Sequence, residues 1–222
     1  NITSGLELIR KQHGADVECY GLTMPLITKA DGTKFGKTES GTVWLDPKKT
    51  SPYEMYQFLV NAEDAKVVEY LKRLTFLDKE EIERLEECVK NEPHLREAQK
   101  VLGREVVTFL HGSDAYETAL KITNALFRGN IRELSADEQR DALRSMENVQ
   151  VSEAMDLAST LVSAKIASSK REAREWIKSG SIQINGEKVQ DETRVIDASS
   201  ALVDDMILIK RGKRNYYVLT FA

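Results

Sequence analysis

The feature that most constrains the fold is a series of helix-start signals in the middle of the chain. Ser51 is followed by Pro52 and Glu54, which places a serine at the N-cap, a proline at the first helical position and a glutamate at the third. Apolar residues after each start recur at intervals of three and four, as along the buried face of a helix. We therefore expect five or six short helices, packed as a compact helical domain, over residues 51–145. A capping residue with an acidic residue three positions later also occurs at Asp78, Asp114 and Ser135.

The last third of the chain has a different pattern and predicts a small α+β unit at residues 152–222. Residues 146–151 carry no helical period, so we expect them to form a linker. The hairpin signal Asn-Gly at residues 185–186 lies among apolar stretches that are typical of strands. The expected elements are helices at 153–162 and 169–180 and strands at 182–184, 206–209 and 216–221.

The first fifty residues combine a helical pattern, a strand pattern and a polar loop. Residues 2–11 are expected to form a helix, and residues 19–28 a strand whose proline marks an edge or an end. The polar loop contains the motif GTKFGKT at residues 32–38. A P-loop has four residues between its first glycine and its Gly-Lys-Thr, whereas this motif has three, so a P-loop NTPase fails on spacing. Lys34 and Lys37 leave two interpretations: a loop that closes over a polyphosphate, or a solvated basic turn.

Composition excludes several classes of protein. The formal net charge of −4 argues against a generic nucleic-acid binder, and no apolar stretch is long enough to span a membrane. Cys19 and Cys88 lie far apart in the sequence and near no histidine cluster. We therefore predict no metal site, and we expect both cysteines to be free thiols in a reducing cytoplasm.

Cations gather on one expected helix and one expected turn near the C-terminus. Arg171, Arg174 and Lys178 lie three and four residues apart, so they share one helix face, next to Lys170. Such a face can follow the phosphates of RNA, or it can be a solvated face with ordinary charge pairs, and charge alone does not decide. The turn before the last strand adds Lys210, Arg211, Lys213 and Arg214.

Several stretches carry a resemblance to a known family. The motif KFGKT at residues 34–38 resembles the second signature of the class I aminoacyl-tRNA synthetases. The wider stretches at residues 1–10, 21–41 and 44–58 resemble the bacterial tyrosyl-tRNA synthetases in particular, and the similarity runs over all 222 residues. The motifs SKREAR and IKSGSIQINGEKV in the C-terminal unit look like an S4 RNA-binding domain, the module that ends these enzymes.

The resemblance implies a multidomain architecture. Residues 1–50 would be the end of a Rossmann-type α/β catalytic domain that carries the KFGKT loop. Residues 51–145 would be the all-α, anticodon-facing domain, and residues 152–222 a small α+β S4-like domain that grips the tRNA. The intact enzymes of the family are cytoplasmic homodimers, whose interface would lie largely outside this chain.

The resemblance also implies a reaction. ATP, accompanied by Mg²⁺, would activate tyrosine to tyrosyl-adenylate, and the tyrosyl group would then pass to tRNATyr. Carried over by position, Lys34, Lys37 and Thr38 would contact the transition state as ATP-binding residues, and Phe35 and Gly36 would shape the loop. The RNA-binding residues would be Lys170, Arg171, Arg174, Lys178, Lys210, Arg211, Lys213 and Arg214.

Two signatures of the family are absent from the sequence. None of the three histidines (His13, His94 and His111) lies in a His-x-Gly-His pattern, and no Asp-Gln-Trp-Gly segment occurs. We therefore expect the chain to be inactive alone. The alternative is a non-catalytic S4-type RNA-binding protein, although such a module would have no use for the loop at residues 32–38.

Overall fold

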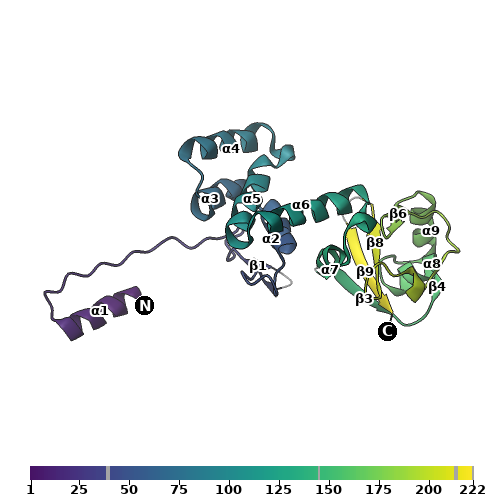
Figure 1. Cartoon of the computed structure of the whole chain (residues 1–222), viewed down its shortest axis with the longest axis horizontal. Coiled ribbons are helices and arrows are strands. Elements are labelled where there is room, and N and C mark those ends of the chain that lie inside the picture. Colours follow the sequence, from purple (N-terminus) through teal and green to yellow (C-terminus); the bar gives the residue numbers. More distant parts are fainter. Residues whose placement is uncertain (39–40, 145, 213–214, 222) are drawn as a thin grey trace.

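The computed structural model describes residues 1–38, 41–144, 146–212 and 215–221. The molecule is elongated, with one helix at the end of an extended segment, a group of helices in the middle and a sheet on the C-terminal side (Figure 1). Helices and sheet are therefore both present, as the sequence predicts, in two parts that follow one another along the chain.

The N-terminal segment packs little before residue 25. Helix α1 (Ile2–His13) buries none of its residues. The strand expected at residues 19–28 is not formed, and its only pairing is an isolated bridge between Thr28 and Lys34. A strand needs a neighbour for its backbone N–H and C=O groups, and the described residues offer no backbone partner to residues 19–26. Two short strands, β1 (Lys37–Thr38) and β2 (Gly41–Thr42), pair as an antiparallel hairpin.

The described part of the middle region contains six α-helices, which confirms the expected number. Ser51 and Glu54 form the predicted capping box, and Asp78 accepts a hydrogen bond from the Glu81 amide. Asp114 is not an N-cap, because the chain turns at Gly112 with φ of +89° and helix begins at the next residue. The helices are α2 (Pro52–Val60), α3 (Asp64–Leu74), α4 (Lys79–Asn91), α5 (Glu97–His111), α6 (Ser113–Arg128) and α7 (Ala136–Arg144), with 3₁₀ turns at Pro93–Leu95 and Ile131–Glu133.

The C-terminal part is built on a five-stranded sheet with the strand order β3-β9-β8-β5-β6. Its strands are β3 (Glu147–Val151), β5 (Ile182–Ile184), β6 (Glu187–Lys188), β8 (Met206–Arg211) and β9 (Asn215–Phe221). Helices α8 (Leu157–Ser163) and α9 (Lys170–Lys178), the small pair β4 (Met155–Asp156) and β7 (Val195–Ile196), and a 3₁₀ turn at Ala198–Ser200 complete this part. Asn185 and Gly186 both have positive φ, as the predicted hairpin turn requires.

The linker expected at residues 146–151 is wrong. Residues 147–151 form β3, which pairs in parallel with β9 from Glu147 opposite Tyr217 to Val151 opposite Phe221. Val151 is buried at the end of this strand. The polar sequence ENVQV contains only two apolar side chains, so its strand character depends on the partner strand and not on its own pattern.

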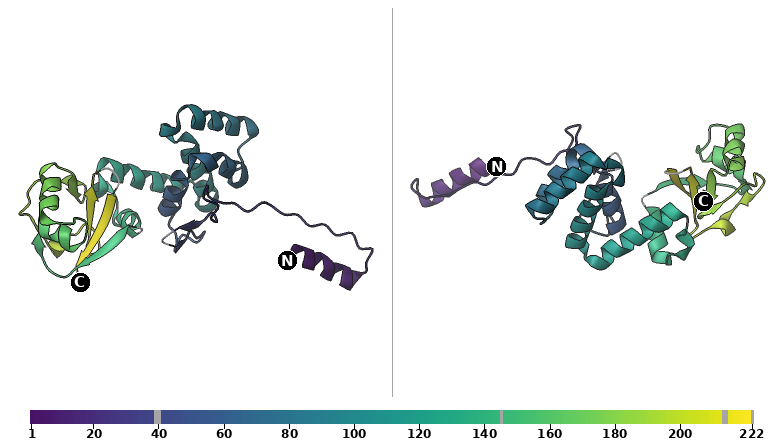
Figure 2. Two further views of the ribbon diagram at one scale, coloured as in Figure 1. Left: turned by 180° about the vertical axis from the view of Figure 1, so that it is seen from behind. Right: turned by 90° about the horizontal axis from the view of Figure 1, so that it is seen from above.

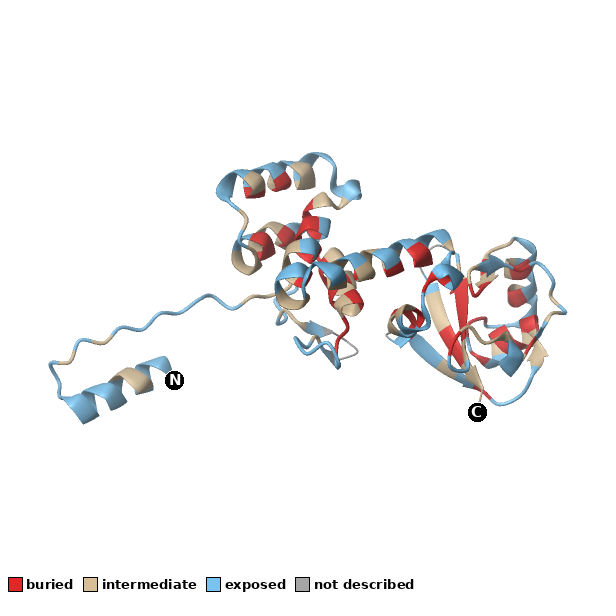
Figure 3. Ribbon diagram, viewed as in Figure 1, coloured by how far each residue is buried: buried red, intermediate tan, exposed pale blue. Residues whose placement is uncertain are grey.

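The sheet is buried on both faces, which explains the continuous apolar run in β8. Ile207 and Ile209 belong to a core with α8 and α9. Leu208 and Val218 belong to the core of the helical region. Figure 3 shows buried residues along these strands and on the inward sides of the helices. The helical and sheet-containing parts therefore share a packed interface.

Candidate functional site: the lysine turn and the basic helix face

The segment around KFGKT is held in shape by its own backbone hydrogen bonds. The Lys29 amide donates to the Thr33 carbonyl at 2.8 Å, the Phe35 amide to the Ile27 carbonyl at 3.1 Å, and the Val43 amide to the Gly36 carbonyl at 2.8 Å. These bonds lie on either side of the hairpin of β1 and β2, so the described residues between 27 and 43 form successive hydrogen-bonded turns.

Within it, Lys34 and Lys37 stand at the two ends of one tight turn. The Lys37 amide donates to the Lys34 carbonyl at 3.3 Å, and Gly36 at the third position has φ of +84°, a conformation that favours glycine. Both lysines are exposed, whereas Phe35 and Gly36 between them are partly buried. The turn therefore presents two ammonium groups to solvent and turns its aromatic residue toward the protein.

Phe35 fixes this turn to the helical region. Its ring centroid lies 4.4 Å from that of Tyr70 on α3 and 5.0 Å from that of Phe58 on α2. The Tyr70 hydroxyl donates to the Thr28 carbonyl at 2.9 Å, and the Ala30 amide donates to a Glu63 carboxylate oxygen at 2.9 Å. No sequence pattern identified these helix residues, because their role depends on contacts with residues more than twenty positions away.

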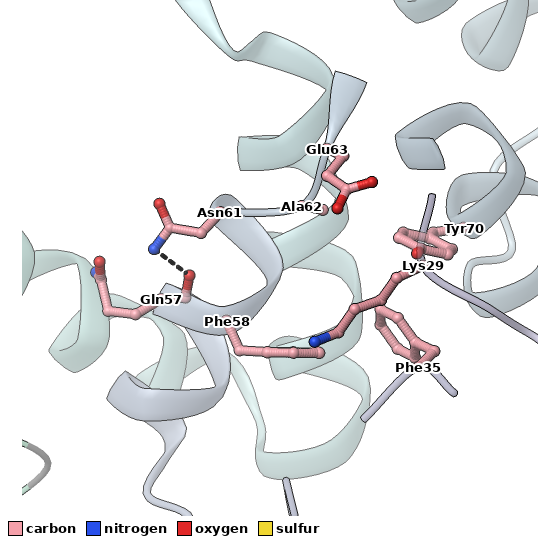
Figure 4. A pocket seen from close by; sticks show the side chains of 8 residues that line it. All are labelled: Lys29, Phe35, Gln57, Phe58, Asn61, Ala62, Glu63 and Tyr70. Atoms are coloured by element: carbon pink, nitrogen blue, oxygen red, sulfur yellow. Dashed lines mark hydrogen bonds between the residues drawn. The ribbon is translucent and has the colours of Figure 1, made fainter. Parts of the chain in front are cut away.

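Two cavities flank Phe35. One, of about 390 Å³, is bordered by Phe35, Phe58, Tyr70 and polar groups that include Lys29 and Glu63 (Figure 4). The other, of about 440 Å³, is mostly apolar and extends from Phe35 to the exposed rings of α5 and the α3–α4 connection. The Thr38 side chain, which the resemblance places among the ATP contacts, lies outside the described residues.

The second predicted site lies on α9, where the structure places four of its eight cations. Ser169 caps the helix by accepting a hydrogen bond from the Glu172 amide. Lys170, Arg171, Arg174 and Lys178 are all exposed. Arg171 is within 3.3 Å of Glu175, an exposed pair that adds little stability, and Arg174 is within 3.5 Å of the partly buried Glu192. The cations of this face are therefore accessible to a phosphate backbone.

The turn cations differ from the expectation. Lys210 is only 6% exposed, and its ammonium group donates to backbone carbonyls of α6, so its assignment to an RNA-facing surface is wrong. Arg211 is partly buried, stacks 4.6 Å from the Trp176 ring centroid and donates to the Ile166 carbonyl. Both residues belong to β8 and not to the turn itself, because that strand continues two residues further than predicted. Lys213 and Arg214 lie outside the described residues.

The comparisons with known proteins point to the same regions. Residues 1–128, more than half of the chain, match the family described as "tRNA synthetases class I (W and Y)". The chain belongs to this family. Residues 138–219 match a second family, described as "Tyrosine--tRNA ligase SYY-like C-terminal domain". The lysine turn thus lies within the class I synthetase match, and the basic face of α9 within the C-terminal match.

Curated relatives extend this similarity over the whole chain. A tyrosine–tRNA ligase of Staphylococcus carnosus is 50% identical over 100% of this chain and 53% of its own length. One of Bacillus pumilus is 49% identical, again over 100% of this chain and 53% of its own length. This class I synthetase chain therefore spans about half the length of the curated relatives it matches. A solution structure of a tyrosyl-tRNA synthetase C-terminal domain is 38% identical, covers 44% of this chain and 100% of that chain, and has a TM-score of 0.35.

Neither a metal cluster nor a membrane span is found in the described residues. They contain no group of three or more histidine, cysteine, aspartate or glutamate side chains that could hold a metal ion. None of the described helices is long and apolar enough to cross a bilayer.

Proposed function

We propose that this chain is the part of a tyrosine–tRNA ligase that holds the ATP phosphates and binds the tRNA. The observation that carries the proposal is the lysine turn. Lys34 and Lys37 are exposed at the two ends of a turn that Phe35 anchors, in a chain 50% identical to a tyrosine–tRNA ligase along its whole length. The reaction joins tyrosine to the α-phosphate of ATP with release of pyrophosphate, and then transfers the tyrosyl group to tRNATyr with release of AMP.

In this reaction the lysines would act where negative charge develops. As the tyrosine carboxylate attacks the α-phosphate, charge accumulates on the leaving pyrophosphate, and an ammonium group held nearby stabilises it. Holding the backbone of the turn in advance lowers the cost of aligning the two ammonium groups. Thr38 would add a hydroxyl donor next to Lys37.

The family resemblance implies Mg²⁺, but the described residues contain no set of side chains that could bind it. The turn offers ammonium groups, which repel a metal ion, and no group of three or more potential ligand side chains occurs among the described residues. The ion would therefore enter as part of the ATP complex, and we assign no step to it.

The C-terminal part would supply the tRNA contacts. We propose that residues 152–222 act as an S4-like domain whose phosphate-binding face is Lys170, Arg171, Arg174 and Lys178, extended by Lys213 and Arg214. Residues 51–145 would face the anticodon, and residues 1–50 would complete the catalytic domain. In the full-length enzyme, a cytoplasmic homodimer, this chain would supply the C-terminal half of each subunit.

The test is a chimera in which this chain replaces the matching half of the Staphylococcus carnosus ligase. We expect tyrosine-dependent exchange of pyrophosphate into ATP and charging of tRNATyr. Lys37→Ala should lower the activation rate roughly 10²- to 10³-fold with little change in the KM for tyrosine, because the ammonium acts mainly in the transition state. Lys72→Ala, on an exposed position of α3, is the matched control. An inactive chimera, or a Lys37→Ala rate within threefold of the parent chimera, would contradict the proposal.

A further inference from the structure

Helix α6 runs from the group of helices toward the sheet (Figure 1 and Figure 2). Its C-terminal end accepts hydrogen bonds from one side chain of β8 and one of β9. The Lys210 ammonium donates to the Leu126 carbonyl at 3.1 Å and to the Phe127 carbonyl at 3.4 Å. The Tyr216 hydroxyl donates to the same Leu126 carbonyl at 3.2 Å. The ammonium also lies 5.1 Å from the centroid of the Tyr216 ring. Two residues of the sheet thus hold the end of a helix more than eighty residues earlier in the chain.

The chemistry of this contact is specific. The last carbonyl groups of a helix lack intrahelical partners and carry partial negative charge, so a cation is favoured there. Lys210 makes no ion pair with a carboxylate in the described part of the chain, and its charge is met by the carbonyls and the Tyr216 ring. A buried ammonium needs such partners, and it loses them if the sheet moves away from α6. The contact therefore opposes separation of the two parts.

A close approach of two backbone segments accompanies the Lys210 contact. Gly129, just after α6, lies so close to Gly186 in the β5–β6 turn that a Cβ at Gly186 would clash with the Gly129 carbonyl oxygen. At the rim, Arg132 pairs with Glu187 at 3.3 Å. The interface thus combines a buried cation, a close backbone approach and a peripheral ion pair.

We propose that Lys210 is a positioning residue, which locks the C-terminal part onto the end of α6 and so sets where the basic face of α9 stands relative to the lysine turn. This inference rests on the proposed function, because the orientation matters only if one tRNA engages both parts of the chain. A rigid arrangement lets the second contact form at high effective concentration once the first is made.

The orientation can be measured without RNA in the 222-residue chain. Cys19 and Cys88 are replaced by serine, and single cysteines at Glu80 on α4 and Glu153 after β3, both exposed, carry spin labels. The distribution of distances between the two labels reports how the helical and sheet-containing parts are arranged. We expect one narrow distribution for the parent chain.

Two variants and one control test whether the contacts of Lys210 and Tyr216 with α6 fix the orientation of the two parts. Lys210→Met keeps an unbranched apolar side chain but removes the ammonium donor, and Tyr216→Phe removes only the hydroxyl. We expect both to broaden the distance distribution, Lys210→Met more strongly. Lys188→Met, at an exposed position of β6, should keep the narrow distribution. If Lys210→Met does not fold by circular dichroism, Tyr216→Phe decides. A broad distribution in the parent, or a narrow one in a folded variant, overturns the proposal.

Measurements of RNA binding distinguish a failure of this inference from a failure of the proposed function. For Lys210→Met, affinity for a short RNA duplex, which engages the α9 face alone, should be unchanged, while affinity for full-length tRNATyr falls about tenfold. Equal losses for both RNAs would overturn the positioning role. A parent chain that binds neither RNA refutes the RNA-binding part of the proposed function, and the label distances then decide on Lys210 alone.

Discussion

Replacing Phe35 by alanine tests whether its ring anchors the lysine turn to the helices, because the substitution removes the ring and leaves both lysines in place. The ring packs against Phe58 and Tyr70, and it borders both neighbouring cavities. Truncating a fully buried phenylalanine costs about 3–5 kcal/mol. Because Phe35 is partly exposed but has two aromatic partners, we expect the free energy of unfolding to fall by about 2–3 kcal/mol.

Phe76→Ala provides the matched control. Phe76 is 84% exposed and meets one ring, that of Phe109, edge-on at 5.3 Å. The same substitution there should cost less than about 1 kcal/mol. Both variants replace phenylalanine by alanine, and they differ only in how tightly the original ring is packed.

The assay is urea unfolding followed by the fluorescence of Trp44, which lies close after the turn region. The chain has two tryptophans, so a Trp176→Phe background leaves Trp44 as the single reporter. The Lys49 ammonium lies 4.2 Å from the Trp44 ring centroid, and this contact should be lost on unfolding. Equal shifts of the unfolding midpoint for Phe35→Ala and Phe76→Ala would refute the anchoring argument.

Three further predictions concern other parts of the chain. Gly186→Ala should lower the melting temperature by several degrees more than Gly112→Ala, because both have positive φ but only the former would clash with backbone. The pKa of Glu138 is held below its usual value by hydrogen bonds from a lysine of α6 and from the cap of α7, so this carboxylate stabilises the fold above its unfolded-state pKa near 4.5. That stability should disappear as the pH falls through the lowered folded pKa, and Glu138→Gln should flatten the acid limb of a thermal-stability profile. Replacing Arg174 and Lys178 by alanine should weaken binding to cognate and unrelated tRNAs alike, and reduce the salt slope of binding by about one or two units in a titration over several salt concentrations; unchanged affinity and slope would mean a merely solvated face.

Local signals in the sequence predicted local structure well. The caps at Ser51, Asp78 and Ser135 and the turn at Asn185-Gly186 each depend on a few consecutive residues, and all four are confirmed. Asp114 has the same local pattern but not the same role, because Gly112 caps both the end of α5 and the start of α6, so Asp114 already lies inside the helix.

Features that depend on distant partners were mispredicted. The stretch ENVQV becomes a strand through pairing with β9, about seventy residues later. Lys210 ends an apolar run and so resembles a turn residue, but the carbonyls that bury it belong to α6. The roles of Lys34, Lys37 and Thr38 stay predictions, since the resemblance and not the fold assigns them.

The parallel pairing of β3 with β9 has a consequence for synthesis. These are the first and last strands of the C-terminal sheet, and β3 leaves the ribosome long before its partner exists. The helical region, whose contacts are more local, can fold while β3 is still unpaired in the nascent chain. Until β9 emerges, Val149 and Val151 remain without their strand partner. A chaperone that binds extended apolar segments would bind β3 during this interval.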